Sequence, residues 1–186
     1  MAFWSDAYTN LEPKRVYRWV MLLGGIPQYM VKKVTKPSFE VTTAEHKYLN
    51  HTFYYPGRVT YEAVSVTLVD PVNPDAAGTM MSILEVSGYN IPELETDLNT
   101  ISKAKATRAL GLVSIKQIDA EGAMVEQFDL INAWVSKVAF GELDYENDAL
   151  VDVTLDLRYD FAILNPAAKA RTVEGLPWGG ELEAGP

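Results

Sequence analysis

Hydrophobic and polar positions alternate along much of this chain, most regularly between Ala149 and Phe161. The apolar positions are Val151, Val153, Leu155, Leu157, Tyr159 and Phe161, and the polar ones are Asp152, Thr154, Asp156, Arg158 and Asp160. Successive side chains of a strand point to opposite faces of a sheet. The pattern therefore predicts one closing strand over Ala149 to Leu164, with one buried face and one wet, mostly acidic face.

Other segments of the chain show the same strand signals. The predicted strands cover residues 15–23, 28–34, 38–43, 46–55, 59–69, 112–118, 123–131 and 134–140. Gly24, Gly25 and Pro27 predict a hairpin between the first two strands, and Pro56-Gly57 predicts the end of the fourth. Residues 119–122 (DAEG) predict a hairpin turn between 112–118 and 123–131.

A helical period interrupts the strands once. The apolar residues Ala77, Met80, Met81 and Leu84 have the spacing of one helix face, and Asn73-Pro74 has the composition of a helix start. We predict a helix over about 74–87, and a loop with a short helix over residues 89–110. Because helices do not alternate with strands, the fold class is mainly β: two packed antiparallel sheets, as a β-sandwich or barrel, with one flanking α-helix.

The predicted domain organisation is a single β domain with an arm at each end. The domain spans residues 15–164, preceded by an N-terminal arm over 1–14 and followed by a flexible C-terminal tail over 165–186 that is rich in glycine and proline. At 186 residues and 48% hydrophobic composition, such a chain can bury a sizeable core.

Composition excludes several classes of function. The chain has no cysteine, so disulfides, thiolate metal sites and cysteine nucleophiles are excluded. A net charge of −9 argues against a protein that grips nucleic acid through lysine and arginine. The N-terminus lacks the pattern of a signal peptide, and no apolar stretch reaches the roughly 18 residues that predict a transmembrane helix, so we expect no membrane insertion.

The sequence offers little for catalysis. Its two histidines, His46 and His51, fall on opposite faces of the strand predicted there, so we expect no shared metal ion. The acidic residues of segment 142–148 do not have the spacing of a calcium loop, and a solvated loop is the simpler interpretation. No nucleophile, phosphate or dinucleotide motif is present. We expect no enzyme activity, no catalytic residues, no cofactor and no bound metal; a hydrolase with dispersed carboxylates is the weakest alternative.

Aromatic residues gather in one polar segment. Tyr48, Phe53, Tyr54 and Tyr55 fit two interpretations: an ordinary half-buried strand, or a long hairpin over about Val41 to Tyr61 that projects from the core and meets another subunit. Trp4 in the N-terminal arm and Trp178 in the tail are explained by docking onto a neighbouring subunit or by frayed ends. The candidate inter-subunit contacts are Tyr48, Phe53, Tyr54, Tyr55, Arg58, Trp4 and Trp178.

Two stretches of the sequence carry a family resemblance. The first is Tyr55 to Pro71 (YPGRVTYEAVSVTLVDP). The second begins at Ile101 (ISKAKATRALG) and closes with Gly141 to Tyr145 (GELDY) and Leu157 to Phe161 (LRYDF). Together they resemble the tail tube proteins of contractile-tailed bacteriophages, the myovirus type, over roughly residues 15–164.

The resemblance implies a structural virion protein. Members of that family form hexameric rings whose inner sheets join into one β-barrel, and the rings stack into the inner tail tube through which DNA is ejected. It also implies partners: further copies of this chain, the sheath protein, the baseplate tube initiator, the tape measure protein and the tail terminator. DNA would pass without specific binding, and the protein would reside in the virion tail after assembly in the host cytoplasm.

Besides the hydrolase, three alternatives to the tail tube remain. Two lie within the resemblance: a tube-initiating baseplate protein, or the tube subunit of a bacterial contractile injection system. The third belongs to a different class, a β-sandwich adaptor that binds another protein and does not polymerise.

A ring would leave one surface facing a central bore. Alternation alone suggests these lumen-facing candidates: Glu40, Thr42, Ser65, Thr67, Gln127 and Asp129. If the acidic excess of the chain faced this bore, it would repel DNA phosphates. For contacts between rings we favour the hairpin from Glu45 to Arg58.

Overall fold

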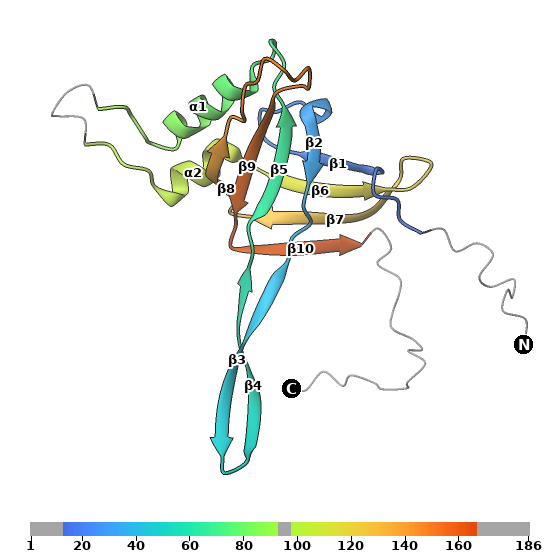
Figure 1. The fold of residues 1–186 in the computed structure, drawn as a ribbon, viewed down its shortest axis with the longest axis vertical. Helices are drawn as coiled ribbons and strands as arrows, with labels where there is room; N and C mark the ends of the chain where they lie inside the picture. The colour runs from blue at the N-terminus through green and yellow to red at the C-terminus, as the bar shows by residue number, and fades with distance from the viewer. Residues whose placement is uncertain (1–12, 93–97, 167–186) are drawn as a thin grey trace, which may run out of the picture.

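The computed structural model describes residues 13–92 and 98–166, and these form a mainly β structure (Figure 1). Two four-stranded antiparallel sheets pack against each other, with a two-stranded hairpin extending beyond them and two α-helices beside them. The predicted fold class is confirmed, and the strands of the two sheets cross steeply in Figure 1. No helix among the described residues is long and apolar enough to cross a membrane.

The first sheet has the strand order β1-β6-β7-β10. Its strands are β1 (Trp19–Leu22), β6 (Val113–Ile118), β7 (Met124–Ile131) and β10 (Phe161–Pro166). The predicted β6–β7 hairpin is confirmed, and its turn is closed by the Asp119 carboxylate, which accepts hydrogen bonds from the backbone N–H of Glu121 (3.0 Å) and Ala123 (2.8 Å).

The second sheet has the order β2-β5-β9-β8. Its strands are β2 (Val31–Val34), β5 (Val64–Val69), β9 (Asp152–Arg158) and β8 (Trp134–Ala139). The alternation that predicted β9 is confirmed: Val153, Leu155 and Leu157 are fully buried, and they pair in register with the buried residues of β5. Each such side chain contributes about 1.5–3 kcal/mol by leaving water, so this pair of strands forms the centre of the core.

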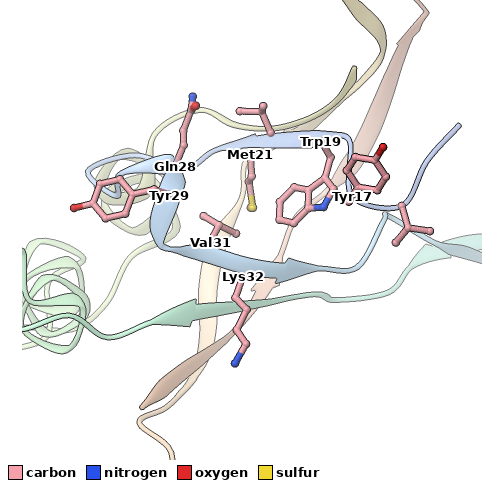
Figure 2. Close-up of a pocket in the computed structure, with 9 residues that line it drawn as sticks. Tyr17, Trp19, Met21, Gln28, Tyr29, Val31 and Lys32 are labelled. Carbon is pink, nitrogen blue, oxygen red and sulfur yellow. The ribbon is translucent and has the colours of Figure 1, made fainter. Parts of the chain in front are cut away.

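The predicted hairpin between residues 15–23 and 28–34 is wrong. β1 pairs with β6 of the first sheet and β2 pairs with β5 of the second, so the turn at Gly24-Gly25 carries the chain from one sheet to the other. A single bridge, Leu23 with Ile26, closes the turn itself. Figure 2 shows Met21 on β1 and Val31 on β2 pointing toward each other across the gap between the sheets.

The predicted closing strand is divided in two. β9 ends at Arg158 in the second sheet and β10 begins at Phe161 in the first. The Asp160 carboxylate holds the corner by accepting hydrogen bonds from Lys103 Nζ and Asn132 Nδ2, each 2.7 Å long. The buried parity also changes at this corner: β9 buries odd-numbered residues, whereas on β10 Ala162 packs against the core and Phe161, predicted on the buried face, is 44% exposed. Alternation could not show the crossing, because it does not record which sheet a strand joins. The C-terminal half also runs past its predicted end: residues 165 and 166, assigned to the tail, belong to β10.

Two helices flank the second sheet, where α2 packs beside β8. The predicted helix is α1 (Ala76–Val86), and its N-cap is Asp75 rather than Asn73, since the Asp75 carboxylate accepts a hydrogen bond from the Gly78 N–H at 3.0 Å. The short helix expected within residues 89–110 is α2 (Lys103–Leu110), capped by Ser102.

The long hairpin is formed by β3 (Phe39–Tyr48) and β4 (His51–Tyr61), which pair only with each other among the described residues. Two predicted boundaries are wrong here. β4 continues through Pro56-Gly57, and the strand predicted over 59–69 is broken at Glu62 and Ala63, where the chain enters the sandwich. The hairpin that projects from the core, one of the two interpretations of the aromatic segment, is confirmed (Figure 1).

Candidate self-assembly surfaces

The β3–β4 hairpin buries almost nothing within the described chain. Every residue of its two strands is exposed except Tyr61, which is half-buried at the base. An isolated two-stranded hairpin is marginally stable in water, because it has no second layer to cover its faces. We therefore expect another surface to cover the faces of this hairpin.

A β-bulge interrupts the hairpin in its half nearer the sandwich. The register shifts between Val41 and Thr43, where the Thr42 Oγ1 accepts a hydrogen bond from the Arg58 N–H at 2.9 Å. Gly57 lies against Thr42 so closely that a Cβ there would fall 2.3 Å from the Thr42 Oγ1. Only glycine fits this approach, and such bulges increase the local twist of a strand pair.

The base of the hairpin is anchored by aromatic rings. Tyr61 contacts Phe39 on the neighbouring strand, with ring centroids 6.1 Å apart, and Tyr159 of the core, at 5.7 Å. Burial is the main cause that raises the pKa of Tyr159, and Tyr61 and Glu62 add to it, so the phenol stays neutral at physiological pH. The aromatic stack thus joins the hairpin to the sandwich.

The half of the hairpin nearer its tip carries the aromatic residues that were predicted to contact another subunit. Register places Tyr48, Phe53 and Tyr55 on one face and Tyr54 on the other, and all four side chains are at least half exposed. Whether they contact another subunit stays a prediction, as it does for Arg58, whose backbone lies in the bulge. Trp4 and Trp178 lie outside the described residues.

The sequence placed His46 and His51 on one strand, but in the structure they lie on two different strands. His46 is on β3 opposite Phe53, and His51 is on β4 opposite Tyr48, so the two histidines are diagonal neighbours on the same face. The argument from opposite faces was therefore wrong. Within the described segments, no group of three or more metal-ligating side chains comes together.

A buried carboxylate holds the root of the hairpin and the beginning of the described chain. Glu126 on β7 is 8% exposed, and its two carboxylate oxygens accept hydrogen bonds from Lys14 and Lys36. Lys36 precedes β3, and its Nζ also donates to Gln117 at 2.6 Å. Burial alone would raise the pKa of Glu126, but the hydrogen bonds and charges of the two lysines outweigh burial and leave it below the usual value. Sequence alternation gave no signal for this contact, which joins residues about 90 and 112 positions apart.

The two sheets have open edges. Among the described residues, β1 and β10 each pair with one strand only, and the same is true of β2 and β8. Unpaired N–H and C=O groups at sheet edges favour pairing with another chain. Beside the β1 and β2 edges lies an open groove lined by aromatic and apolar side chains, including Tyr17, Trp19 and Tyr29 (Figure 2).

The lumen-facing candidates lie on three separate surfaces. Ser65 and Thr67 are on the outer face of the second sheet, since their neighbours on β5 point into the core. Gln127 and Asp129 are on the outer face of the first sheet. Glu40 and Thr42 belong to the hairpin. A bore lined by one sheet cannot include both of the first two pairs, because the outer faces point away from each other.

The outer face of the second sheet is polar, with mixed charge. Lys32 forms an ion pair with Asp152 (2.6 Å), and Lys137 lies opposite Asp156 in the register of β8 and β9. The acidic excess is therefore not gathered on this face, contrary to the expectation of an acidic bore if this face lines it. One cluster of acidic residues instead occupies the loop between β8 and β9.

Comparison with known proteins identifies the fold. No family model matches the sequence, and no curated protein sequence does either. A chain from the cryo-EM structure of the anti-feeding prophage tube-terminating cap superposes with a TM-score of 0.66 at 16% identity, covering 90% of this chain and 100% of that one. The chain has the fold of contractile-system tube and cap proteins.

Two further solved structures support the same fold. A chain from the extended sheath–tube complex of PVC, an extracellular contractile injection system, matches with a TM-score of 0.60 at 14% identity, covering 87% of this chain and 97% of that one. A chain from the six-fold symmetrised anti-feeding prophage baseplate matches with the same TM-score and identity, covering 84% and 97%. The fold implied by the family resemblance is thereby confirmed.

Proposed function

We propose that this protein is the tube subunit of a contractile phage tail, with a structural and not a catalytic role. Six copies form a ring, rings stack into a tube, and DNA passes through the tube into the host during ejection. The observation that carries the proposal is a sandwich with four open edge strands and an exposed aromatic hairpin, in a fold matched by tube and cap assemblies.

Ring formation follows from the open edges. An interface that is repeated by rotation closes into a ring, and pairing edge strands around that ring removes the unpaired backbone groups of each copy. The six-fold symmetry of the matched baseplate assembly supports six copies. Stacking follows from the hairpin, because an identical head-to-tail contact between rings extends without limit.

We assign the bore to the outer face of the second sheet, which carries Ser65 and Thr67. Its strands run roughly along the direction of the hairpin in Figure 1, so a ring that stacks through the hairpin would have these strands along the tube. Most charges on this face have an opposite charge nearby, as in the pair of Lys32 with Asp152. Such a surface offers phosphates no continuous basic track, which suits passage of DNA without specific binding.

The remaining partners follow from this role. They are the sheath protein around the tube, the baseplate tube initiator at one end, the tail terminator at the other, and the tape measure protein inside. Assembly takes place in the host cytoplasm, and the product resides in the virion tail.

A second candidate function is the tube subunit or tube initiator of a contractile injection system. The matches to anti-feeding prophage and PVC assemblies favour it, since both are contractile systems whose cap, baseplate or sheath–tube complex contains a chain of this fold. It shares the ring and the hairpin contact with the phage tube and differs in the cargo.

Deletion of residues 48–55 tests the proposal. Because these residues are exposed, the deleted protein should remain folded and soluble but fail to polymerise. A milder variant replaces Tyr48, Phe53 and Tyr55 with serine, and the matched control is Tyr89→Ser, at an exposed residue that follows α1 and lies outside the hairpin and the open sheet edges. Light scattering after size exclusion and negative-stain images give the outcome.

Two results would contradict the proposal. Tubes formed by the deletion variant would show that the hairpin is not needed for stacking. A wild-type protein that stays a 20.7 kDa monomer at every concentration would favour the adaptor, the alternative without polymerisation.

A further inference from the structure

The groove beside β1 and β2 is long and lined by apolar side chains (Figure 2). It consists of two adjoining depressions, of about 630 Å³ and about 480 Å³, that share Val16 and Trp19. Val16 is 93% exposed, and Tyr17 and Tyr29 are each 74% exposed. Apolar groups gathered at one exposed site are typical of a surface that another segment covers. We call this surface the edge groove.

The last described strand ends close to the edge groove. Successive register partners form one row across the first sheet: Trp19, Gln117, Glu126 and Pro166. The first three of these line the groove, so the chain leaves β10 one strand away from the lining residue Glu126. Leu164 has the parity of Ala162, which packs against the core, but Leu164 is half exposed. The sandwich is therefore open at the point where residues 167–186 begin.

The edge groove carries an excess of positive charge. Its lining includes Lys14, Lys33 and Lys36 but a single carboxylate, Glu126, which Lys14 and Lys36 share. Lys32 is not counted, because it already has a carboxylate partner on the outer face of the second sheet. Three lysines less one glutamate leave two positive charges without a carboxylate among the described residues of the groove.

The C-terminal part of the sequence carries groups that match this groove. Leu176, Pro177 and Trp178 form an apolar cluster. Residues 172–186 contain no lysine or arginine, and their carboxylates are Glu174, Glu181 and Glu183. A tryptophan buries a large apolar area while its N–H stays near water, which suits an apolar groove with a wet rim. Opposite charges around such an apolar contact set its register.

The length of the chain allows this segment to reach the groove of its own copy. Three strand spacings of about 4.8 Å separate Pro166 from Trp19, which is roughly 14 Å. Residues 167–175 lie between Pro166 and Leu176 and span up to about 30 Å when extended. A tether of this length holds a segment at an effective concentration on the order of millimolar, whereas a second copy supplies the same segment only at the bulk protein concentration.

We propose that residues 174–183 bind in the edge groove of the same copy. The cluster around Trp178 covers the exposed apolar side chains of the groove, and the three glutamates face its excess of lysines. Residues 1–12 also join the described chain beside the groove, but they carry two carboxylates against three, and the open position at Leu164 leads into the C-terminal segment instead. The contact forms within one copy, so it does not depend on ring or tube formation.

Cysteine cross-linking in the full-length chain tests the contact, because the chain has no cysteine of its own. Gly179→Cys, next to Trp178, is combined with Val16→Cys in the groove, and the dilute protein is oxidised mildly. In the matched control Lys116→Cys replaces Val16→Cys, because Lys116 lies on the outer face of the first sheet only two strands from β10. The internal disulfide, read from migration on a non-reducing gel, should form in about tenfold greater yield with Val16→Cys.

A second measurement does not depend on disulfide geometry. An environment-sensitive dye on Gly179→Cys reports whether this position leaves water. Val16→Ser with Lys33→Glu weakens the groove and should shift the dye emission to the red, toward the value in urea-unfolded protein. The matched control is Val72→Ser with Lys105→Glu, at exposed residues outside the groove, and it should leave the emission unchanged.

Four results would overturn the inference. Two are equal disulfide yields with Val16→Cys and Lys116→Cys, and an emission that the groove variant does not shift. The third is a disulfide that forms mainly between tagged and untagged chains, which would give the groove to a second copy. The fourth is a greater yield from Ser5→Cys than from Gly179→Cys, which would give it to residues 1–12. Tube formation is scored separately by negative stain, so failure here leaves the proposed function intact.

Discussion

The Glu126 contact predicts a stability that depends on pH. Glu126→Gln keeps the shape of the side chain but removes the negative charge between Lys14 and Lys36. A hydrogen bond that involves a charged group contributes about 1.5–3 kcal/mol and a neutral one about 0.5–1.5 kcal/mol. Both lysine donors stay charged in the variant and only the acceptor becomes neutral, so the two bonds would together lose at most about 2–3 kcal/mol. Since the side chains of the two lysines are 49% and 50% exposed, solvent screens part of their interaction with Glu126. We therefore expect the free energy of unfolding to fall by about 1–2 kcal/mol at pH 7.

The direction of the pH effect follows from the lowered pKa of Glu126. Burial opposes ionisation, but the lysines hold the pKa of the folded protein below the ordinary value of 4.5. The stabilisation by the Glu126 contact is therefore fully present above pH 4.5 and is lost as the pH falls through the pKa of Glu126 in the folded protein. The free-energy difference between wild type and Glu126→Gln should therefore shrink as the pH falls below 4.5 and through the lowered pKa of Glu126 in the folded protein.

Urea unfolding followed by circular dichroism measures this difference at pH 7 and at the lowest pH below 4.5 at which the wild type is still folded. The matched control is Glu85→Gln, at an exposed carboxylate of α1, which should change the free energy of unfolding by less than about 0.5 kcal/mol at either pH. A Glu126→Gln protein that matches wild type at pH 7, or that shows the same deficit at both pH values, would refute the role assigned to the charge.

Two further predictions concern the core and the hairpin. Leu155→Ala, at a fully buried position of β9, should lower the free energy of unfolding by about 3–5 kcal/mol in urea titrations, whereas Thr154→Ala on the outer face should cost less than about 1 kcal/mol; equal effects would contradict the assignment of faces. Gly57→Ala should leave the melting temperature of the sandwich unchanged and abolish tubes in negative stain, because the new Cβ would lie 2.8 Å from the Thr42 carbonyl oxygen; normal tubes would show that the bulge geometry is not needed.

Local pattern was sufficient wherever a signal and its structural consequence lie close together in the chain. Alternation located β9, and the turn chemistry around Asp119 located the β6–β7 hairpin. Aromatic residues in polar surroundings left two interpretations, a half-buried strand or a projecting hairpin, and the structure shows the hairpin, with exposed side chains. Helical spacing located α1, although the N-cap is Asp75, because Asn73 and Asp75 lie two positions apart and both residue types can cap a helix.

The sequence by itself therefore determined the class of fold, the approximate positions of most strands and helices, and the apolar face of strands such as β5 and β9, but not that of β10. Tertiary structure alone decided which strands pair: β1 and β2 separate into different sheets, and one uninterrupted alternation becomes β9 and β10. The physical reason is that alternation records only which side chains leave water, and both sheets bury their apolar faces in the same core. The Glu126 contact and the edge groove likewise depend on residues far apart in the chain, which only the folded structure brings together.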